Sequence, residues 1–153
     1  MKISDILHKD AIIANLKSKD KKGVLEELAA AISTTAGTES REIVKVLLER
    51  EQLGSTGIGG GIGIPHGKLS TISSIVVGIG ISHEGVEFDS LDNKPVYIFF
   101  LLVTPENSTG SHLRVLAQLS KLLKGNDFKN SLRQAGSAEK IAEIIQKTDE
   151  DFK

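Results

Sequence analysis

The first third of the chain contains one short apolar run followed by two stretches with hydrophobic residues at helical spacing. The apolar run over 11–16 predicts a strand. The helical spacing predicts a helix over 21–36 that ends at Gly37, and a second helix over 40–50 with Ser40 as its N-cap. The hydrophobic residues that define the two helices are Val24, Leu25, Leu28, Ile32, Ile43, Val44, Leu47 and Leu48.

In the middle of the chain, hydrophobic residues recur at every second position, a spacing that is typical of strands. Residues 62–64 predict a short strand that stops at Pro65, and residues 74–82 predict a longer one. One face of the longer strand carries Gly78 and Gly80, which indicates that another element packs very close to it.

An almost wholly apolar run over 95–103 follows. It predicts a central strand that is buried on both faces. The interval between Ser82 and Pro95 is hairpin-like, so we expect an antiparallel pair of strands there.

Helical spacing returns in the last third of the chain, after a loop that contains Pro105 and residues 107–110. The elements expected here are helices over 111–124, 126–134 and 137–147 and a frayed polar tail over 148–153. Strands mixed with helices predict an α/β fold in a single domain, 1–153, in which helices sandwich a mixed parallel and antiparallel sheet.

Charge and cysteine content narrow the classes of partner and chemistry. The 153 residues carry a formal net charge of −1, from 19 Lys and Arg against 20 Asp and Glu, which argues against nucleic acid or an anionic membrane as the main partner. No cysteine is present, so disulfides, thiolate chemistry and cysteine-bound zinc are excluded. Residues 1–10 do not look like a signal peptide and no run of 18 apolar residues exists, so we expect a cytoplasmic protein without membrane insertion.

The glycines concentrate over 54–67, where seven of the 15 fall within 14 residues. A P-loop would need a glycine at Ile62 and a hydroxyl at Leu69, so this phosphate-binding motif does not fit. The dinucleotide-binding pattern also fails, because Ile62 and His83 stand where its last glycine belongs. No zinc-binding spacing and no serine-hydrolase elbow is found either, so we expect no cofactor and no metal.

Among the four histidines, His66 has the most unusual setting. Pro65 stiffens the chain before it and Gly67 leaves space beside the ring, which favours a histidine that a large partner approaches, although a hydrogen-bonded loop histidine has the same surroundings. His112 lies at the expected N-terminus of a helix, where free N–H groups favour a phosphoryl group; an ordinary helix residue is the alternative. His8 and His83 are interpreted as surface residues, the second in a turn.

The stretches over 48–59 and 61–68, with the runs Gly-Ser-Thr-Gly-Ile-Gly and Ile-Pro-His-Gly-Lys, resemble the fructose/mannitol-type enzyme IIA domains of the bacterial phosphoenolpyruvate-dependent phosphotransferase system. They are most similar to the nitrogen-regulatory branch, and the resemblance includes 111–116 and the C-terminal helices. Gly60 departs from that branch, whose members usually have asparagine there, and is expected to loosen the loop. The resemblance implies a mixed-sheet α/β sandwich with a phosphoryl-carrying histidine.

The same resemblance implies roles for three residues. His66 is the phosphoryl acceptor, His112 the second active-site histidine and Arg50 the active-site arginine, with a histidine-containing phosphocarrier protein as the donor. A neutral imidazole nitrogen is a competent nucleophile, and a forked guanidinium suits phosphoryl oxygens, although Arg50 also fits an ordinary salt bridge at the helix end. Ser55 and Thr56 either bond to the phosphoryl group or only form hydrogen bonds within the turn. Lys68 either adds positive potential for the phosphoryl group or is an ordinary solvated lysine.

Two functions are consistent with this family. Nitrogen-regulatory members mostly act as switches, whose phosphorylation state alters their binding to target proteins, whereas sugar-specific members pass the phosphoryl group to an enzyme IIB domain. Phosphorylation adds roughly −1.5 to −2 charges, a large local change for a chain of net charge −1. We therefore expect a regulatory phosphotransferase component that forms a phosphohistidine, with sugar uptake as the alternative.

Overall fold

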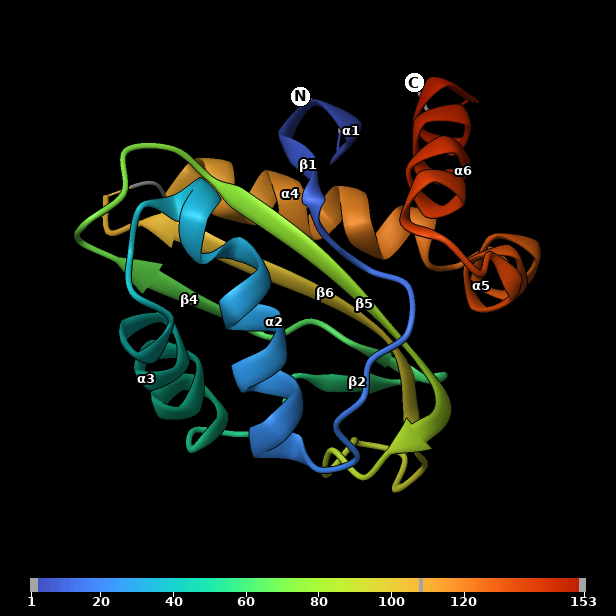
Figure 1. Cartoon of the computed structure of the whole chain (residues 1–153), viewed down its shortest axis with the longest axis horizontal. Helices are drawn as coiled ribbons and strands as arrows, with labels where there is room; N and C mark the ends of the chain where they lie inside the picture. Colours follow the sequence, from blue (N-terminus) through green and yellow to red (C-terminus); the bar gives the residue numbers. More distant parts are fainter. Residues whose placement is uncertain (1–2, 108, 152–153) are drawn as a thin grey trace.

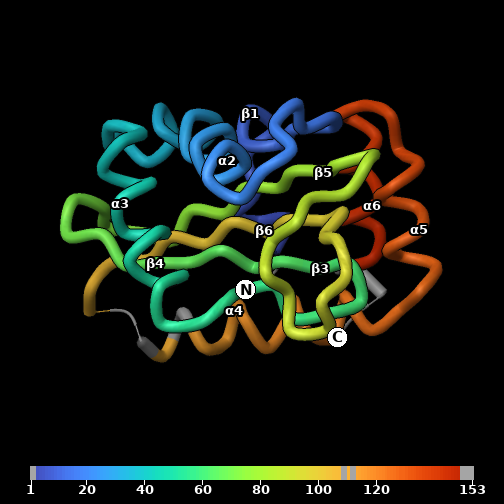
Figure 2. Tube along the Cα trace, turned by 90° about the horizontal axis from the view of Figure 1, so that it is seen from below, coloured from blue at the N-terminus to red at the C-terminus, as the bar shows by residue number. Residues whose placement is uncertain are grey.

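The computed structural model of the chain describes residues 3–107 and 109–151, apart from the side chains of 109, 111, 112 and 149–151. A mixed sheet lies between two layers of helices, which confirms the predicted α/β class (Figure 1, Figure 2). The helices are α1 (Ile3–Ile6), α2 (Lys21–Ala36), α3 (Ser40–Glu51), α4 (Thr109–Leu122), α5 (Asn126–Gln134) and α6 (Ala138–Asp151). Figure 2 shows α2 and α3 above the sheet and α4 below it, with α5 and α6 at one end.

The sheet combines parallel and antiparallel pairs around one central strand. Its strands are β1 (Leu7–Ile13), β2 (Gly57–Gly59), β3 (Ile62–Gly63), β4 (His66–Leu69), β5 (Val76–Val86) and β6 (Val96–Pro105). The order is β1-β5-β6-β3-β2, and β4 also pairs with β6. The β5–β6 pair is antiparallel, as expected, whereas β3 and β4 both run parallel to β6 along its other edge.

The side chains of β6 alternate between two hydrophobic cores, and nearly all of them are buried. One core lies under α2 and α3 and receives Phe99, Leu101 and Val103. The other lies under α4, α5 and α6 and receives Ile98, Phe100 and Leu102. The prediction of a central strand buried on both faces is therefore confirmed.

The close packing predicted at the glycines of β5 is also confirmed. A Cβ atom at Gly78 would lie 2.9 Å from Cγ2 of Ile32, and one at Gly80 would lie 2.8 Å from Cδ2 of Leu28. Both neighbours belong to α2, so these glycines let the helix approach the sheet more closely than side chains would allow.

The ends of the two N-terminal helices agree only in part with the sequence prediction. Helix α2 is capped by Asp20, whose carboxylate accepts a hydrogen bond from the backbone N–H of Gly23, and it ends as expected at Gly37, where φ is +65°. Helix α3 begins at Ser40, but its N-cap residue is Glu39 and no side chain caps it. The prediction of Ser40 as the N-cap was therefore wrong.

Two strands begin or end away from their predicted bounds, because the ends of a strand depend on its pairing across the sheet. Strand β1 covers 7–13 rather than 11–16, since its register with β5 shifts between Leu7 and Ile12. Strand β5 continues to Val86, and an irregularity in its pairing with β6 falls where a turn was expected. His83 is exposed, as predicted, but it lies in this strand rather than in a turn.

The structure also contains elements that the sequence did not predict and one that is longer than predicted. Strands β2 and β4 flank the short strand β3, in segments where the glycines and Pro65 indicated only a loop. Helix α6 continues to Asp151, and the hydroxyl of Thr148 donates to the carbonyl of Ile144, 2.7 Å away. The expected frayed tail is thus helical over 148–151, because a polar sequence does not by itself end a helix, and 152–153 lie outside the described residues.

Candidate functional site

His66 is the first residue of β4, and its position in the sheet determines which face its ring occupies. His66 is in register with Leu102 of β6, which belongs to the core under α4. The next residue, Gly67, lies toward α3, where a Cβ atom would be 3.1 Å from Cγ2 of Val46. Because side chains alternate along a strand, the ring of His66 lies on the face that α4 covers.

Both ring nitrogens of His66 have hydrogen-bond partners. Nδ1 lies 2.8 Å from the carbonyl oxygen of Ile64, and Nε of Arg50 lies 3.2 Å from Nε2. A carbonyl oxygen only accepts and a guanidinium only donates, so Nδ1 carries the proton and Nε2 keeps its lone pair. The half-buried ring is therefore in the neutral form, with its nucleophilic nitrogen toward Arg50.

The surroundings of His66 favour this neutral form. Burial lowers the pKa of His66 below its ordinary value, and the positive charge of Arg50 lowers it further, whereas the Ile64 carbonyl and the Glu51 carboxylate act in the opposite direction. Burial is the largest of these effects. A histidine that is neutral near pH 7 can act as a nucleophile without first losing a proton.

Arg50 lies in the last turn of α3 and makes two hydrogen bonds at this site. Its Nε donates to His66, and its Nη1 donates to the carbonyl of Gly54, 3.0 Å away. Within residues 3–107 and 109–151 no carboxylate forms an ion pair with Arg50. The described contacts therefore do not support the alternative of an ordinary helix-end salt bridge.

The hydroxyl groups of the glycine-rich loop serve the loop itself. The hydroxyl of Ser55 donates to the carbonyl of Phe88 at 2.8 Å and accepts from the N–H of Gly57 at 3.0 Å. Thr56 is buried, and its hydroxyl donates to the carboxylate of Glu51. These bonds favour the turn-bonding interpretation of both residues, and Lys68 is exposed.

A buried acid next to the site was not predicted from the sequence. The side chain of Glu51 is only 4% exposed and forms an ion pair with Lys21, Nζ to Oε1, at 3.0 Å. A signal for it exists, because Glu51 follows Ile43 and Leu47 at intervals of four residues and so falls on the inward face of α3. A charged residue on an apolar helix stripe requires a buried partner.

The second predicted histidine lies on an element that packs over the correct face. His112 is in the first turn of α4, which follows β6, and α4 covers the face of the sheet that carries the His66 ring. The side chain of His112 is outside the described part of the structure, so its role stays a prediction. His8 and His83, by contrast, are exposed on β1 and β5.

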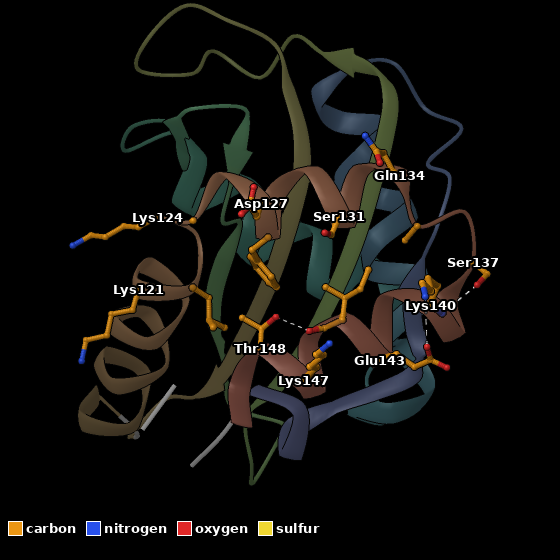
Figure 3. Close-up of a pocket in the computed structure, with 15 residues that line it drawn as sticks. Lys121, Lys124, Asp127, Ser131, Gln134, Ser137, Lys140, Glu143, Lys147 and Thr148 are labelled. Atoms are coloured by element: carbon orange, nitrogen blue, oxygen red, sulfur yellow. Dashed lines mark hydrogen bonds and ion pairs between the residues drawn. The ribbon is translucent and has the colours of Figure 1, made fainter. Parts of the chain in front are cut away.

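A large hollow in the described part of the chain lies elsewhere. A groove of about 1480 Å³ lies between the end of α4, α5 and α6, as Figure 3 shows. Its lining includes four lysines and no histidine, and Lys121 and Lys124 extend outward from its edge. This groove is therefore not the site formed by His66 and Arg50.

Two features are absent from the described residues. No group of three or more histidine, cysteine or acidic side chains in that part is arranged to hold a metal ion. Among the helices described, none has the length and the apolar character needed to cross a bilayer.

Comparison with known proteins agrees with this fold. The sequence profile of the family "Phosphoenolpyruvate-dependent sugar phosphotransferase system, EIIA 2" matches residues 5–148. A nitrogen regulatory protein of Bradyrhizobium diazoefficiens is 37% identical over 145 residues, 95% of each chain. A fructose-specific EIIABC component of Bacillus subtilis is 35% identical over 150 residues, 97% of this chain and 24% of that protein.

One solved structure is similar over nearly the whole of both chains. The nitrogen regulatory protein IIA-Ntr of Neisseria meningitidis superposes with a TM-score of 0.88 at 34% identity, covering 94% of this chain and 98% of that one. Profile, relatives and structure agree with the resemblance found in the sequence. The chain belongs to the EIIA 2 family of the phosphoenolpyruvate-dependent sugar phosphotransferase system.

Proposed function

We propose that this protein is a regulatory phosphoryl carrier, in which His66 accepts a phosphoryl group from a histidine-containing phosphocarrier protein. The phosphorylation state then controls which target proteins it binds in the cytoplasm. The observation that supports this most is the state of the His66 ring: Nδ1 bonds to the Ile64 carbonyl, and the lone pair of Nε2 points to the guanidinium of Arg50.

The transfer itself needs no proton movement at His66. The lone pair of Nε2 attacks the phosphorus of the donor phosphohistidine, the new N–P bond forms, and the donor's N–P bond breaks with its electron pair returning to the donor ring. The proton on Nδ1 stays in place, and its bond to the Ile64 carbonyl stabilises the positive charge that develops on the ring.

Arg50 changes partners during this step. In the unphosphorylated protein its Nε–H covers the nitrogen that attacks phosphorus, so the guanidinium has to move aside as the donor arrives. It then stands beside the incoming group, where its N–H donors stabilise charge on the equatorial phosphoryl oxygens. His112, in the first turn of α4, is proposed as a further donor to those oxygens.

The regulatory role is favoured over sugar uptake by the relatives. The Bradyrhizobium protein and the Neisseria structure, both nitrogen regulatory proteins, match this chain over nearly their entire lengths. The similarity to a fructose-specific EIIABC component supports the second candidate, in which the phosphoryl group passes to an enzyme IIB domain. Addition of roughly −1.5 to −2 charges at His66 would change the local potential enough to select partners in the regulatory case.

Phosphorylation with purified components tests the proposal. Incubation with phosphoenolpyruvate, enzyme I and the phosphocarrier protein should label the wild-type chain on Nε2 of His66, which 31P NMR can assign. A His66→Ala variant that is labelled as well as the wild type would remove His66 from the proposal. Partner sets captured by the phosphorylated and unphosphorylated forms should differ; equal sets, together with fast transfer to an enzyme IIB, would favour sugar uptake.

A further inference from the structure

The carboxylate of Glu51 lies at the meeting point of three segments around the site. It is nearly inaccessible to solvent, at the end of α3 and one residue after Arg50. Its oxygens accept from the backbone N–H of Thr56, at 3.1 Å, and from the hydroxyl of the same residue. The third partner is Lys21, the first residue of α2.

Lys21 extends this contact to the residues that follow β5. Its ammonium group is 4.8 Å from the ring centroid of Phe88 and 3.6 Å from a carboxylate oxygen of Asp89. The carbonyl of Phe88 in turn accepts from the hydroxyl of Ser55. Helix α2, the end of α3 and the residues after β5 are therefore joined to the glycine-rich loop through one ion pair, whose carboxylate is buried.

The loop segment held in this way contains the second hydrogen-bond partner of Arg50. Nη1 of Arg50 donates to the carbonyl of Gly54, and the N–H of Gly54 donates to the backbone carbonyl of Glu51 at 3.1 Å. Glu51 therefore holds the loop on both sides of this carbonyl, by its backbone before it and by Thr56 after it. Other bonds hold the residues after Gly54: the Ser55 hydroxyl donates to the Phe88 carbonyl, and the Thr56 carbonyl accepts from the N–H of Ile64. Gly54 itself is bonded, in the described contacts, to Glu51 and Arg50.

We propose that Glu51 is a positioning residue for phosphoryl transfer, which fixes the Gly54 carbonyl and thereby the guanidinium of Arg50. Lys21 completes the arrangement, because it neutralises a carboxylate that would otherwise repel the phosphoryl group. This inference rests on the proposed function of His66, and Glu51 does not itself touch the reacting atoms.

Three variants and one control separate this role from a purely structural one. Glu51→Ala removes both bonds to Thr56, whereas Glu51→Gln keeps an oxygen for the backbone N–H and an amide that can bond the hydroxyl. Thr56→Val removes only the hydroxyl bond at nearly constant volume. Glu49→Ala is the matched control, because Glu49 is an exposed glutamate in the same turn of α3.

The experiment is single-turnover phosphoryl transfer from the 32P-labelled phosphocarrier protein, followed by rapid quench over a range of donor concentrations. For Glu51→Ala we expect the rate constant at saturating donor to fall roughly tenfold or more, with the final labelled fraction and the half-saturating donor concentration unchanged. Thr56→Val should lose roughly fivefold, and Glu51→Gln should recover most of the wild-type rate. Glu49→Ala should match the wild type.

The outcomes separate failure of this inference from failure of the proposed function. A wild-type rate constant in folded Glu51→Ala overturns the positioning role, and so does a loss that appears only in the labelled fraction, or an equal loss in Glu49→Ala. If Glu51→Ala does not fold, a wild-type rate constant for transfer in Thr56→Val overturns the positioning role instead. A wild-type protein that accepts no label, or accepts it at a residue other than His66, contradicts the proposed function itself.

Discussion

Arg50 and His66 meet through a hydrogen bond from Nε of the guanidinium to Nε2 of the imidazole, at 3.2 Å. The two residues lie on different sides of the sheet: Arg50 is in the last turn of α3 on one face, whereas the His66 ring lies on the face covered by α4. The contact therefore passes around the outer edge of β4. An arginine in this place both keeps the nucleophilic nitrogen unprotonated and stays within reach of a group bonded to it.

Replacement of Arg50 should change both the pKa of His66 and the rate of transfer. Loss of the cation in Arg50→Ala should raise the pKa of His66, whereas burial, the larger cause, should continue to lower it. Arg50→Lys loses the planar fork, so its transfer rate should fall about 10- to 100-fold. NMR titration of the ring and rapid-quench kinetics measure the two effects.

The control for Arg50 is Arg41→Ala, an exposed arginine of the same helix whose described hydrogen bond goes to Glu39. It should leave both the pKa of His66 and the transfer rate unchanged. A pKa that does not rise in Arg50→Ala would mean that the guanidinium contact is absent in solution.

The lowered pKa of His66 also predicts how stability depends on pH. The unfolded chain binds a proton at His66 below about pH 6.5, whereas the folded chain binds it only at lower pH. Between the two pKa values the unfolded state holds more protons, so the free energy of unfolding falls as the pH falls through this window. Urea unfolding at pH 7 and pH 5 should show a smaller loss for His66→Gln than for the wild type; an equal loss would contradict the lowered pKa.

His112→Ala tests the residue whose side chain the structure does not describe. If His112 donates to a phosphoryl oxygen, its removal should slow transfer about 10- to 100-fold, the usual effect of losing one hydrogen bond to a charged group. His66 should still become fully labelled, because the nucleophile is intact. His8→Ala, at an exposed position of β1, is the control, and wild-type kinetics in His112→Ala would remove that residue from the mechanism.

The close approach of α3 to β4 can be tested through Gly67. A Cβ atom there would lie 3.1 Å from Cγ2 of Val46, so Gly67→Ala should cost about 1–3 kcal/mol of unfolding free energy. That cost exceeds the gain of about 0.4–1 kcal/mol from a less flexible unfolded chain. In a Val46→Ala background the clash is relieved, and the same substitution should be nearly neutral. Equal costs in both backgrounds, measured in urea, would show that another contact is responsible.

The sequence predicted the layers of this fold better than the details of its site. The stripes of α2 and α3 and the apolar run of β6 are local patterns, and each was found within a few residues of its expected place. Strand β4 could not be predicted, because Pro65 indicates a stop and the strand exists only through pairing with β6. Glu51 was missed for a similar reason: its partners Lys21 and Thr56 come from other segments of the chain.

Gly60 provides a test of whether the departure from asparagine loosens the loop. Its φ is +66°, its N–H donates to a carboxylate oxygen of Asp92 at 3.1 Å, and a Cβ atom there would meet only the mobile end of Lys129, at 3.4 Å. Asparagine tolerates this left-handed conformation better than other side chains, whereas a β-branched residue does not.

Gly60→Asn should therefore change the free energy of unfolding by less than about 0.5 kcal/mol, since the smaller entropy of the unfolded chain offsets the remaining strain. Gly60→Val should cost about 1–2 kcal/mol. Because the bond to Asp92 uses the backbone N–H, both variants should keep it, and the pKa of Asp92, which the N–H groups of Lys94 and Gly60 lower, should stay low in both. Urea unfolding and NMR titration of the Asp92 carboxyl measure these effects. If Gly60→Asn were stabilised by well over 1 kcal/mol, the glycine would indeed be a point of looseness in the wild-type loop.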